Sequence, residues 1–316
     1  MAATTRPSLS KQTLVPSSNS HLPRILCLHG GGTNATIFSA QCRSLSSELQ
    51  GQFRLIFANA PFYSGPGPDV ESVYANWGPF RSWVRPPKTA TPTSTADARV
   101  IKPVEWTSAT LDINAVDTAL ENAIAEDDRQ GGKGEVMGLL GFSQGARMAG
   151  CLLLRRQLQE QQKQKRQRKR NKDENGLDQD VIFEPDGPLP GENENGNGYR
   201  FAVLIAGRGP LIDLDFAQRM RVHFHSHVNG NGNGNGNLPP SFPLPQQLHL
   251  PTIHIHGMRD TNLALNRDLL YCDCVEDTAR LIEWDGDHRV PIKTEDVAPV
   301  VNAICDVARE TGTVLS

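Results

Sequence analysis

Residues 136–146 read VMGLLGFSQGA, an apolar run that breaks at a serine between two glycines. The run before the break is typical of a buried strand, and residues 146–154 after it favour a helix. A G-x-S-x-G sequence at a strand–turn–helix junction is a nucleophile elbow, which exposes the serine hydroxyl at the start of the helix. The glycines two positions before and after Ser143 suit such a bend, because side chains there would collide with neighbouring elements. Other parts of the chain decide between a nucleophile and an ordinary Gly-Ser turn.

Candidate partners for Ser143 occur downstream, each just after a predicted strand. Asp260 follows the apolar run 251–257, and His288 follows the run 280–284. If these runs are parallel strands, both residues lie at the carboxyl edge of the sheet, where Ser143 also emerges. Imidazole can carry a proton from the hydroxyl to a leaving group, and a carboxylate can hold its tautomer. The order Ser, Asp, His is that of α/β-hydrolases.

Two alternatives stay open for this assignment. His288 could be a solvated loop histidine, because charged residues surround it. Asp285 or Asp287 could also orient His288, in which case Asp260 would only cap the helix that follows it.

The glycine-rich loop after the first predicted strand is a candidate for oxyanion binding. Residues 24–29 form an apolar run that continues into Gly30-Gly31-Gly32, similar to the HGGG motif of lipases and esterases. We expect the amide of Gly31 to be one donor, with Gly32 as the alternative, and the amide of Gln144 to be the second. A phosphate-binding loop is the competing interpretation, but the Lys-Ser/Thr ending of a P-loop is missing.

Buried runs alternate with amphipathic segments along most of the chain. Strands are predicted at 24–29, 53–57, 136–140, 201–206, 251–257 and 280–284, and helices at 37–49, 111–124, 146–154, 262–277 and 295–309. The helix over 111–124 is expected to be capped by Thr107 or Ser108. This alternation predicts an α/β protein with a doubly wound, mostly parallel sheet, the α/β-hydrolase fold.

The domain organisation follows from composition. Residues 1–21 are predicted to be a flexible tail, and 22–316 a single α/β-hydrolase domain with low-complexity inserts at about 157–198 and 228–248. We interpret the Gln-, Lys- and Arg-rich run 155–170 as a solvated helix extension leading into a linker, with nucleic-acid contact as the alternative. Three alternating histidines near the second insert lack acidic or Cys partners, which favours an exposed loop over a metal site (His223, His225 and His227).

Composition narrows the class of protein. The chain has 316 residues, 38% of them hydrophobic, and a formal net charge of −3, which argues against a nucleic-acid binder. Its N-terminus has no apolar run of the secretory kind, and no stretch approaches a membrane span. Its six cysteines are scattered and are expected to be reduced thiols. A soluble, cytoplasmic protein is the expectation.

Residues 63–106 are rich in Pro, Gly, Ser and Thr but also carry several aromatic residues. A long irregular stretch inside a compact domain is usually either functional or disordered. The aromatic residues favour a lid or a pocket wall, with Phe62, Trp77 and Trp83 as candidates for lining an acyl pocket.

Four motifs together resemble the fungal serine hydrolase (FSH-type) family. They are Leu28-His29-Gly30, Asn59-Ala60-Pro61-Phe62, Gly141-Phe142-Ser143-Gln144-Gly145-Ala146 and Gly286-Asp287-His288-Arg289-Val290-Pro291. The family includes esterases and thioesterases encoded in polyketide gene clusters, such as the lovastatin-type releasing hydrolases. The resemblance covers most of the chain outside the tail and the two inserts. The charged inserts and the charged neighbours of His288 depart from the family pattern.

The resemblance implies the chemistry that the residues already suggest. Ser143, Asp260 and His288 would hydrolyse an ester or thioester through an acyl-Ser143 intermediate, with no cofactor and no metal. The acyl group would be a polyketide or a fatty acyl chain, released in trans from an acyl carrier domain of a polyketide synthase. A general short-chain carboxylesterase and a catalytically inactive, hydrolase-fold binding protein are the alternatives, and neither a nucleic acid nor a membrane is an expected partner.

Overall fold

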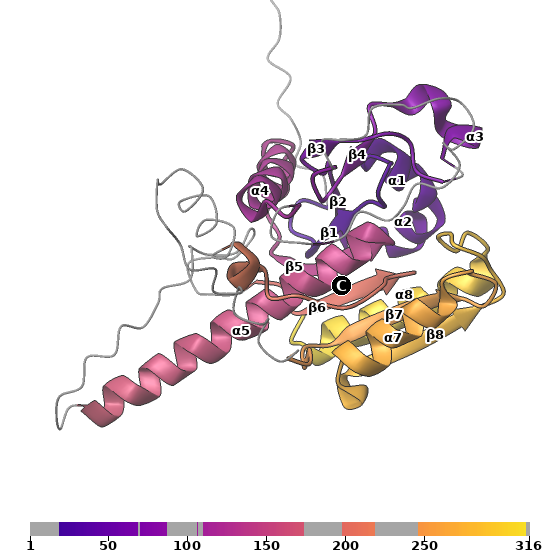
Figure 1. Cartoon of the computed structure of the whole chain (residues 1–316). Coiled ribbons are helices and arrows are strands. Elements are labelled where there is room, and N and C mark those ends of the chain that lie inside the picture. Colours follow the sequence, from indigo (N-terminus) through magenta and orange to yellow (C-terminus); the bar gives the residue numbers. More distant parts are fainter. Residues whose placement is uncertain are drawn as a thin grey trace, which may run out of the picture.

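A six-stranded parallel sheet forms the centre of the protein (Figure 1). The computed structural model describes residues 19–313 except 69, 87–105, 107–109, 174–197 and 219–245. In spatial order the strands are β2 (Arg54–Ala58), β1 (Arg24–Leu28), β5 (Val136–Phe142), β6 (Phe201–Ile205), β7 (Thr252–Gly257) and β8 (Ala279–Trp284). Because every neighbouring pair is parallel, the carboxyl ends of all these strands meet at one edge.

Helices cover both faces of the sheet. The long helices are α1 (Ala35–Gln41), α2 (Arg43–Leu49), α4 (Ile113–Arg129), α5 (Gln144–Asp173), α7 (Leu263–Asp273) and α8 (Thr294–Glu310), and the short ones are α3 (Glu71–Tyr74), η1 (Ala75–Trp77) and η2 (Glu276–Thr278). Helices α4, α5 and α7 share one apolar core with the sheet, and α1, α2 and α8 share another. The predicted doubly wound α/β architecture is confirmed.

The four inner strands, β1, β5, β6 and β7, are buried on both faces, which explains their largely apolar runs. In β1, Ile25 and Cys27 belong to the core under α8, whereas Leu26 and Leu28 belong to the core under α5. A strand of a parallel sheet covered on both sides has no solvent-facing positions, so its sequence shows no polar alternation.

Several predicted helices differ from those in the structure, among them the helix over 262–277, which is α7 followed by η2. The helix predicted over 37–49 is two helices, α1 and α2, that meet at Cys42. Helix α4 begins at Ile113, where the Asp112 carboxylate accepts a hydrogen bond from the amide of Ala115 at 3.3 Å. The caps expected at Thr107 or Ser108 lie outside the described residues.

A small antiparallel sheet, β3 (Phe62–Tyr63) with β4 (Arg81–Ser82), follows β2 and was not predicted. Its second strand joins the glycine-rich loop after β1, since Arg81 and Thr33 form an antiparallel bridge. The segment with the aromatic residues is therefore held against the carboxyl edge of the main sheet.

Helix α5 corrects the interpretation of the basic run that starts at Arg155. The helix extends past the sheet in Figure 1 as expected of an extension, but its middle turns are buried. Arg155 is 2% exposed and pairs with Asp117 of α4 at 2.8 Å and with Asp215 at 2.5 Å. Gln157 is also buried and accepts the amide of His249 at 2.6 Å. These residues are part of the core, and the solvated part of the helix starts later.

We predict that Arg155→Met lowers the free energy of unfolding by about 3–5 kcal/mol, because it leaves the Asp117 and Asp215 carboxylates buried without a counter-charge. Urea unfolding of the full chain measures this. The matched control is Arg129→Met, whose ion pair with Glu126 is 70% exposed on the arginine side and should cost less than about 1 kcal/mol. Equal effects of the two substitutions would contradict a structural role for the buried pair.

Several sequence expectations fall on residues that the structure does not describe. They are most of the 1–21 tail, much of both inserts and the three histidines His223, His225 and His227. The six cysteines are all described and are free thiols. No helix in the described part of the chain combines the length and apolar character needed to cross a membrane.

Candidate active site

Ser143 lies at the turn between β5 and α5, and its backbone is in the left-handed region. It is the residue between the end of β5 at Phe142 and the start of α5 at Gln144, with φ of 53°. This is an uncommon conformation for a residue other than glycine and marks a strained position. The amide of Ser143 donates to the carbonyl of Ile205 in β6 at 2.9 Å, which ties the turn to the neighbouring strand.

The two glycines of the motif have the steric role that the sequence predicts. A methyl group on Gly145 would lie 2.1 Å from the carbonyl oxygen of Leu28, and one on Gly141 would lie 2.3 Å from that of Gly145. Neither backbone oxygen can move aside without disturbing strand β1 or the first turn of α5. The turn therefore accepts only glycine at these positions.

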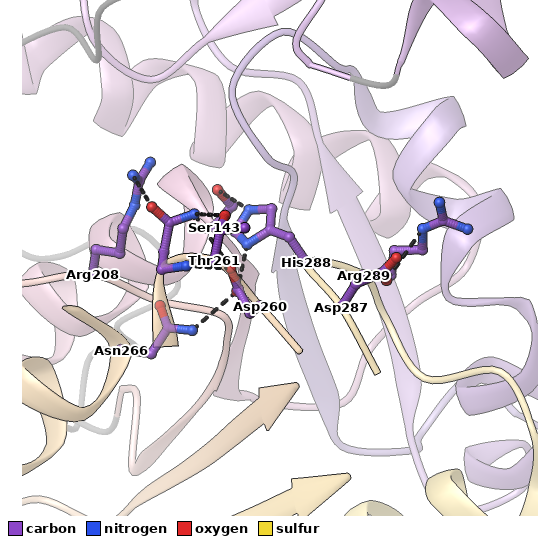
Figure 2. A network of polar contacts seen from close by, with 9 residues as sticks. Ser143, Arg208, Asp260, Thr261, Asn266, Asp287, His288 and Arg289 are labelled. Atoms are coloured by element: carbon purple, nitrogen blue, oxygen red, sulfur yellow. Dashed lines mark hydrogen bonds and ion pairs between the residues drawn. The ribbon is translucent and has the colours of Figure 1, made fainter. Parts of the chain in front are cut away.

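The structure brings Ser143, His288 and Asp260 together in one chain of hydrogen bonds (Figure 2). His288 Nε2 lies 3.0 Å from Ser143 Oγ, and His288 Nδ1 lies 2.7 Å from Asp260 Oδ2. The three residues come from the loops after β5, β7 and β8, which share the carboxyl edge of the sheet. With its Nδ1 proton held by the carboxylate, the imidazole presents Nε2 as an acceptor for the serine hydroxyl.

Asp260 is held as a carboxylate by several donors. Its side chain is fully buried, which by itself raises the pKa, but hydrogen bonds from His288, from the Asn262 amide and from Asn266 outweigh burial and lower the pKa of Asp260. The Asn262 amide donates to Oδ1 at 2.8 Å, and Asn266 Nδ2 donates to Oδ2 at 3.1 Å. Arg208 donates in turn to the Asn262 side chain at 3.3 Å (Figure 2).

Neither alternative carboxylate orients His288 in the structure. Asp287 pairs with Arg289 at 3.3 Å, and Figure 2 shows this pair lying apart from the imidazole. Asp285 pairs with Arg259. Asp260 is thus the carboxylate that contacts His288.

The two predicted oxyanion donors belong to the loop after β1 and to the first residue of α5. The amide of Gly32 donates to the Arg81 carbonyl at 2.9 Å, whereas that of Gly31 has no acceptor among the described residues. Gln144 is the first residue of α5, so its amide has no acceptor within the helix. A methyl group on Gly31 would lie 3.2 Å from the Gln144 side chain, which shows that the loop packs directly on the elbow. Of the two glycines, Gly31 has the amide that is available.

The three candidate pocket residues lie in different surroundings. Trp77 is 44% exposed and lines a cavity of about 610 Å³ together with Asn34, Thr36, Asn59, Asn76, Gly78, Pro79 and Arg81. Phe62 is half-buried, and Cζ of the Arg85 guanidinium lies over its ring, 4.5 Å from the ring centroid. Trp83 is 0% exposed, so it offers no surface to an acyl chain and lies in the core instead. The cavity has the size of a ligand pocket, but none of Ser143, Asp260 and His288 lines it, so the candidate site lies at these three residues rather than in the cavity.

Sequence reasoning did not identify Asn266, which is fully buried in α7 and donates to Asp260. An asparagine in a helix usually faces solvent, and no spacing signal distinguished this one. The signal that could have identified Asn266 is a polar residue at a helical position whose neighbours on the same face are apolar.

Comparisons with known proteins agree with this geometry. A model of the serine hydrolase (FSH1) family matches residues 19–300. Esterase pigG of Monascus ruber is 44% identical over 303 residues, which cover 93% of this chain and 94% of pigG. Probable esterase afoC of Emericella nidulans is 48% identical over 284 residues, which cover 89% of this chain and 88% of afoC. Esterase citA of Monascus ruber is 40% identical over 292 residues, which cover 92% of this chain and 94% of citA. This chain therefore belongs to the serine hydrolase (FSH1) family and is an ester-cleaving hydrolase of α/β-hydrolase fold.

Proposed function

We propose that the protein hydrolyses an acyl ester or thioester through a covalent acyl-Ser143 intermediate. The observation that carries this proposal is the unbroken hydrogen-bond chain from Ser143 through His288 to Asp260. In the first step the Ser143 hydroxyl oxygen attacks the acyl carbonyl carbon while its proton passes to His288 Nε2. The negative charge that develops on the carbonyl oxygen faces the amides of Gly31 and Gln144.

The leaving group then departs with the proton from His288, as an alcohol or a thiol. Asp260 stabilises the imidazolium that exists between these steps, because its buried carboxylate stays ionised. A water molecule next attacks the acyl-enzyme and gives its proton to His288, and the carboxylic acid leaves as Ser143 regains its proton. Every step uses side chains and amides that lie at this edge of the sheet.

The proposed acyl group is an apolar chain, of polyketide or fatty acyl type. Exposed apolar side chains occur in the loops after β7 and β8, which carry Asp260 and His288 (Met258 and Ile292, which are 45% and 48% exposed), and in η1 (Trp77, which is 44% exposed). Exposed apolar surface near a reactive site supports binding of an apolar substrate. The names of the relatives support an ester substrate, and the resemblance to polyketide-releasing hydrolases supports release from an acyl carrier domain.

A panel of acyl esters and thioesters tests this proposal. We predict that kcat/KM rises by up to about fourfold for each methylene that the pocket buries, on the basis of about 0.8 kcal/mol per CH₂. The measurement compares nitrophenyl esters with N-acetylcysteamine thioesters of the same acyl chains, from acetyl to dodecanoyl, and then the preferred acyl group loaded on an acyl carrier domain. A maximum at acetyl would instead indicate a short-chain carboxylesterase. Failure to hydrolyse any of them, together with no fluorophosphonate adduct at Ser143, would indicate a binding protein.

A further inference from the structure

Building on the proposed acyl transfer to Ser143, we propose that Trp83 is a positioning residue that fixes the separation of the two oxyanion amides. The amides belong to different elements: Gly31 lies in the loop after β1, and Gln144 begins α5. Strands β1 and β5 are paired up to Leu28 and Gly141, so the relative position of the two amides beyond the strand ends depends on further contacts. Trp83, directly after β4, contacts both.

The first contact is with the loop that carries Gly31. The indole Nε1–H of Trp83 donates to the carbonyl of His29 at 2.8 Å, and the centroids of the two rings lie 5.4 Å apart. His29 and Trp83 are each 0% exposed, so water cannot replace this bond. A buried donor and acceptor held in this way are costly to separate.

The second contact is with the elbow. The backbone amide of Trp83 donates to Oε1 of the Gln144 side chain at 2.8 Å. The same side chain packs against Gly31, where an added methyl group would lie 3.2 Å from its Cδ, Nε2 and Oε1 atoms. Contacts therefore form a closed ring from His29 through Trp83 and Gln144 to Gly31, which is two residues from His29.

The direction of the Gly31 amide is fixed within this ring. The carbonyl of Gly30 accepts hydrogen bonds from Thr33 Oγ1 at 2.6 Å and from His29 Nδ1 at 2.8 Å. His29 Nε2 accepts a hydrogen bond from the amide of Ala60 at 3.0 Å, so the imidazole proton is on Nδ1. Burial lowers the pKa of His29 to about 4, which keeps the imidazole neutral. Because the C=O and N–H of a trans peptide point in opposite directions, holding the Gly30 carbonyl orients the Gly31 N–H away from these donors.

Trp83 is itself anchored to the same loop through β4. The amide of Arg81 donates to the Thr33 carbonyl at 2.7 Å, and the amide of Gly32 donates to the Arg81 carbonyl at 2.9 Å. The small sheet and the oxyanion loop thus form one unit, and Trp83 connects this unit to the elbow. The backbone N–H of residue 83 does not depend on its side chain, so the indole N–H bound to the His29 carbonyl is the link that requires tryptophan.

Two substitutions break different links of the ring. Trp83→Phe keeps a buried aromatic ring but removes the bond to His29, and Gln144→Met removes the acceptor for the Trp83 amide but keeps the Gln144 backbone amide. Each should lower kcat about 10- to 100-fold with KM changed less than about threefold, because a displaced donor loses contact with the oxyanion rather than with the bound substrate. The double variant should lose no more kcat than the worse single variant, because breaking either contact already releases the Gly31 loop from the elbow.

The control is Phe53→Leu, a buried aromatic residue immediately before β2 that belongs to the other core. It should lower Tm by an amount similar to Trp83→Phe without changing kcat. The positioning role is overturned if kcat is unchanged in both ring variants, if Phe53→Leu loses as much kcat, or if the losses of the two variants multiply in the double variant.

Deuterium uptake by residues 28–34 gives a readout that needs no substrate. Trp83→Phe should increase uptake in this loop and leave α8 unchanged, whereas equal uptake in variant and wild type overturns the proposal. If the wild-type chain forms no fluorophosphonate adduct at Ser143, the proposed function fails, and the deuterium result alone then decides whether Trp83 holds the loop.

Discussion

Ser143→Ala should reduce ester hydrolysis by about 10⁵- to 10⁶-fold, the loss expected when a triad nucleophile is removed. The hydroxyl oxygen is the atom that would carry the acyl group, and no other hydroxyl is hydrogen-bonded to His288 in the described part of the chain. The residual rate should remain above that of water, because the proposed oxyanion donors, the amides of Gly31 and Gln144, are unchanged in this variant. The same variant should lose covalent labelling by a fluorophosphonate, which intact-protein mass spectrometry detects as a single adduct on the wild type.

The matched control is Ser46→Ala in α2, a serine whose hydroxyl plays no part in the site. It should keep full labelling and full activity. Thermal unfolding of Ser143→Ala should stay close to that of wild type, since only one partly buried hydrogen bond is removed. Hydrolysis that persists in Ser143→Ala at the wild-type rate would show that another residue carries the acyl group.

The sequence predicts that Ser143, Asp260 and His288 meet, because these residues occupy positions with local signals. Ser143 is marked by the flanking glycines, and Asp260 and His288 each come directly after a buried run. In a parallel sheet, the residues that follow the strands meet at one edge whatever the intervening segments do. The predicted strands therefore place the triad without knowledge of any tertiary contact.

The residues that support the site could not be predicted in the same way. Trp83 and Gln144 are separated by 61 residues, and Arg155 and Asp117 by 38, so only the folded chain shows that they are bonded. For Arg155 and Trp83, the composition of the neighbouring sequence predicted exposure, whereas both side chains are buried. Arg155 begins a run of polar residues but is buried, and Trp83 lies in a segment that was expected to line a pocket but is held in the core. Burial of a charged or aromatic side chain depends on partners that its own segment does not reveal.

Asp260→Asn should lower kcat about 10⁴-fold, the loss typical when the orienting carboxylate of a triad becomes an amide. The surroundings of Asp260 determine which way the new amide faces. The Asn262 amide donates to Oδ1 at 2.8 Å and needs an oxygen there, so the amide nitrogen takes the place of Oδ2 and faces His288 Nδ1. A donor at that place requires Nδ1 to be the acceptor, so the histidine proton moves to Nε2. The protonated Nε2 can no longer accept the proton of Ser143.

In the wild-type protein, Asn266 Nδ2 donates to Asp260 Oδ2 at 3.1 Å. The substitution replaces that oxygen with an NH₂ group, so two donors would face each other. We therefore expect a loss of stability as well, and activity is compared at a temperature where both proteins are folded. Asp285→Asn and Asp287→Asn are matched controls, because these carboxylates pair with Arg259 and Arg289 and should change kcat less than about twofold. A loss in either control equal to that of Asp260→Asn would move the orienting role to that carboxylate. A kcat within about tenfold of wild type in Asp260→Asn would mean that the imidazole keeps its tautomer without the charge, and that the buried carboxylate serves the fold rather than the proton transfer.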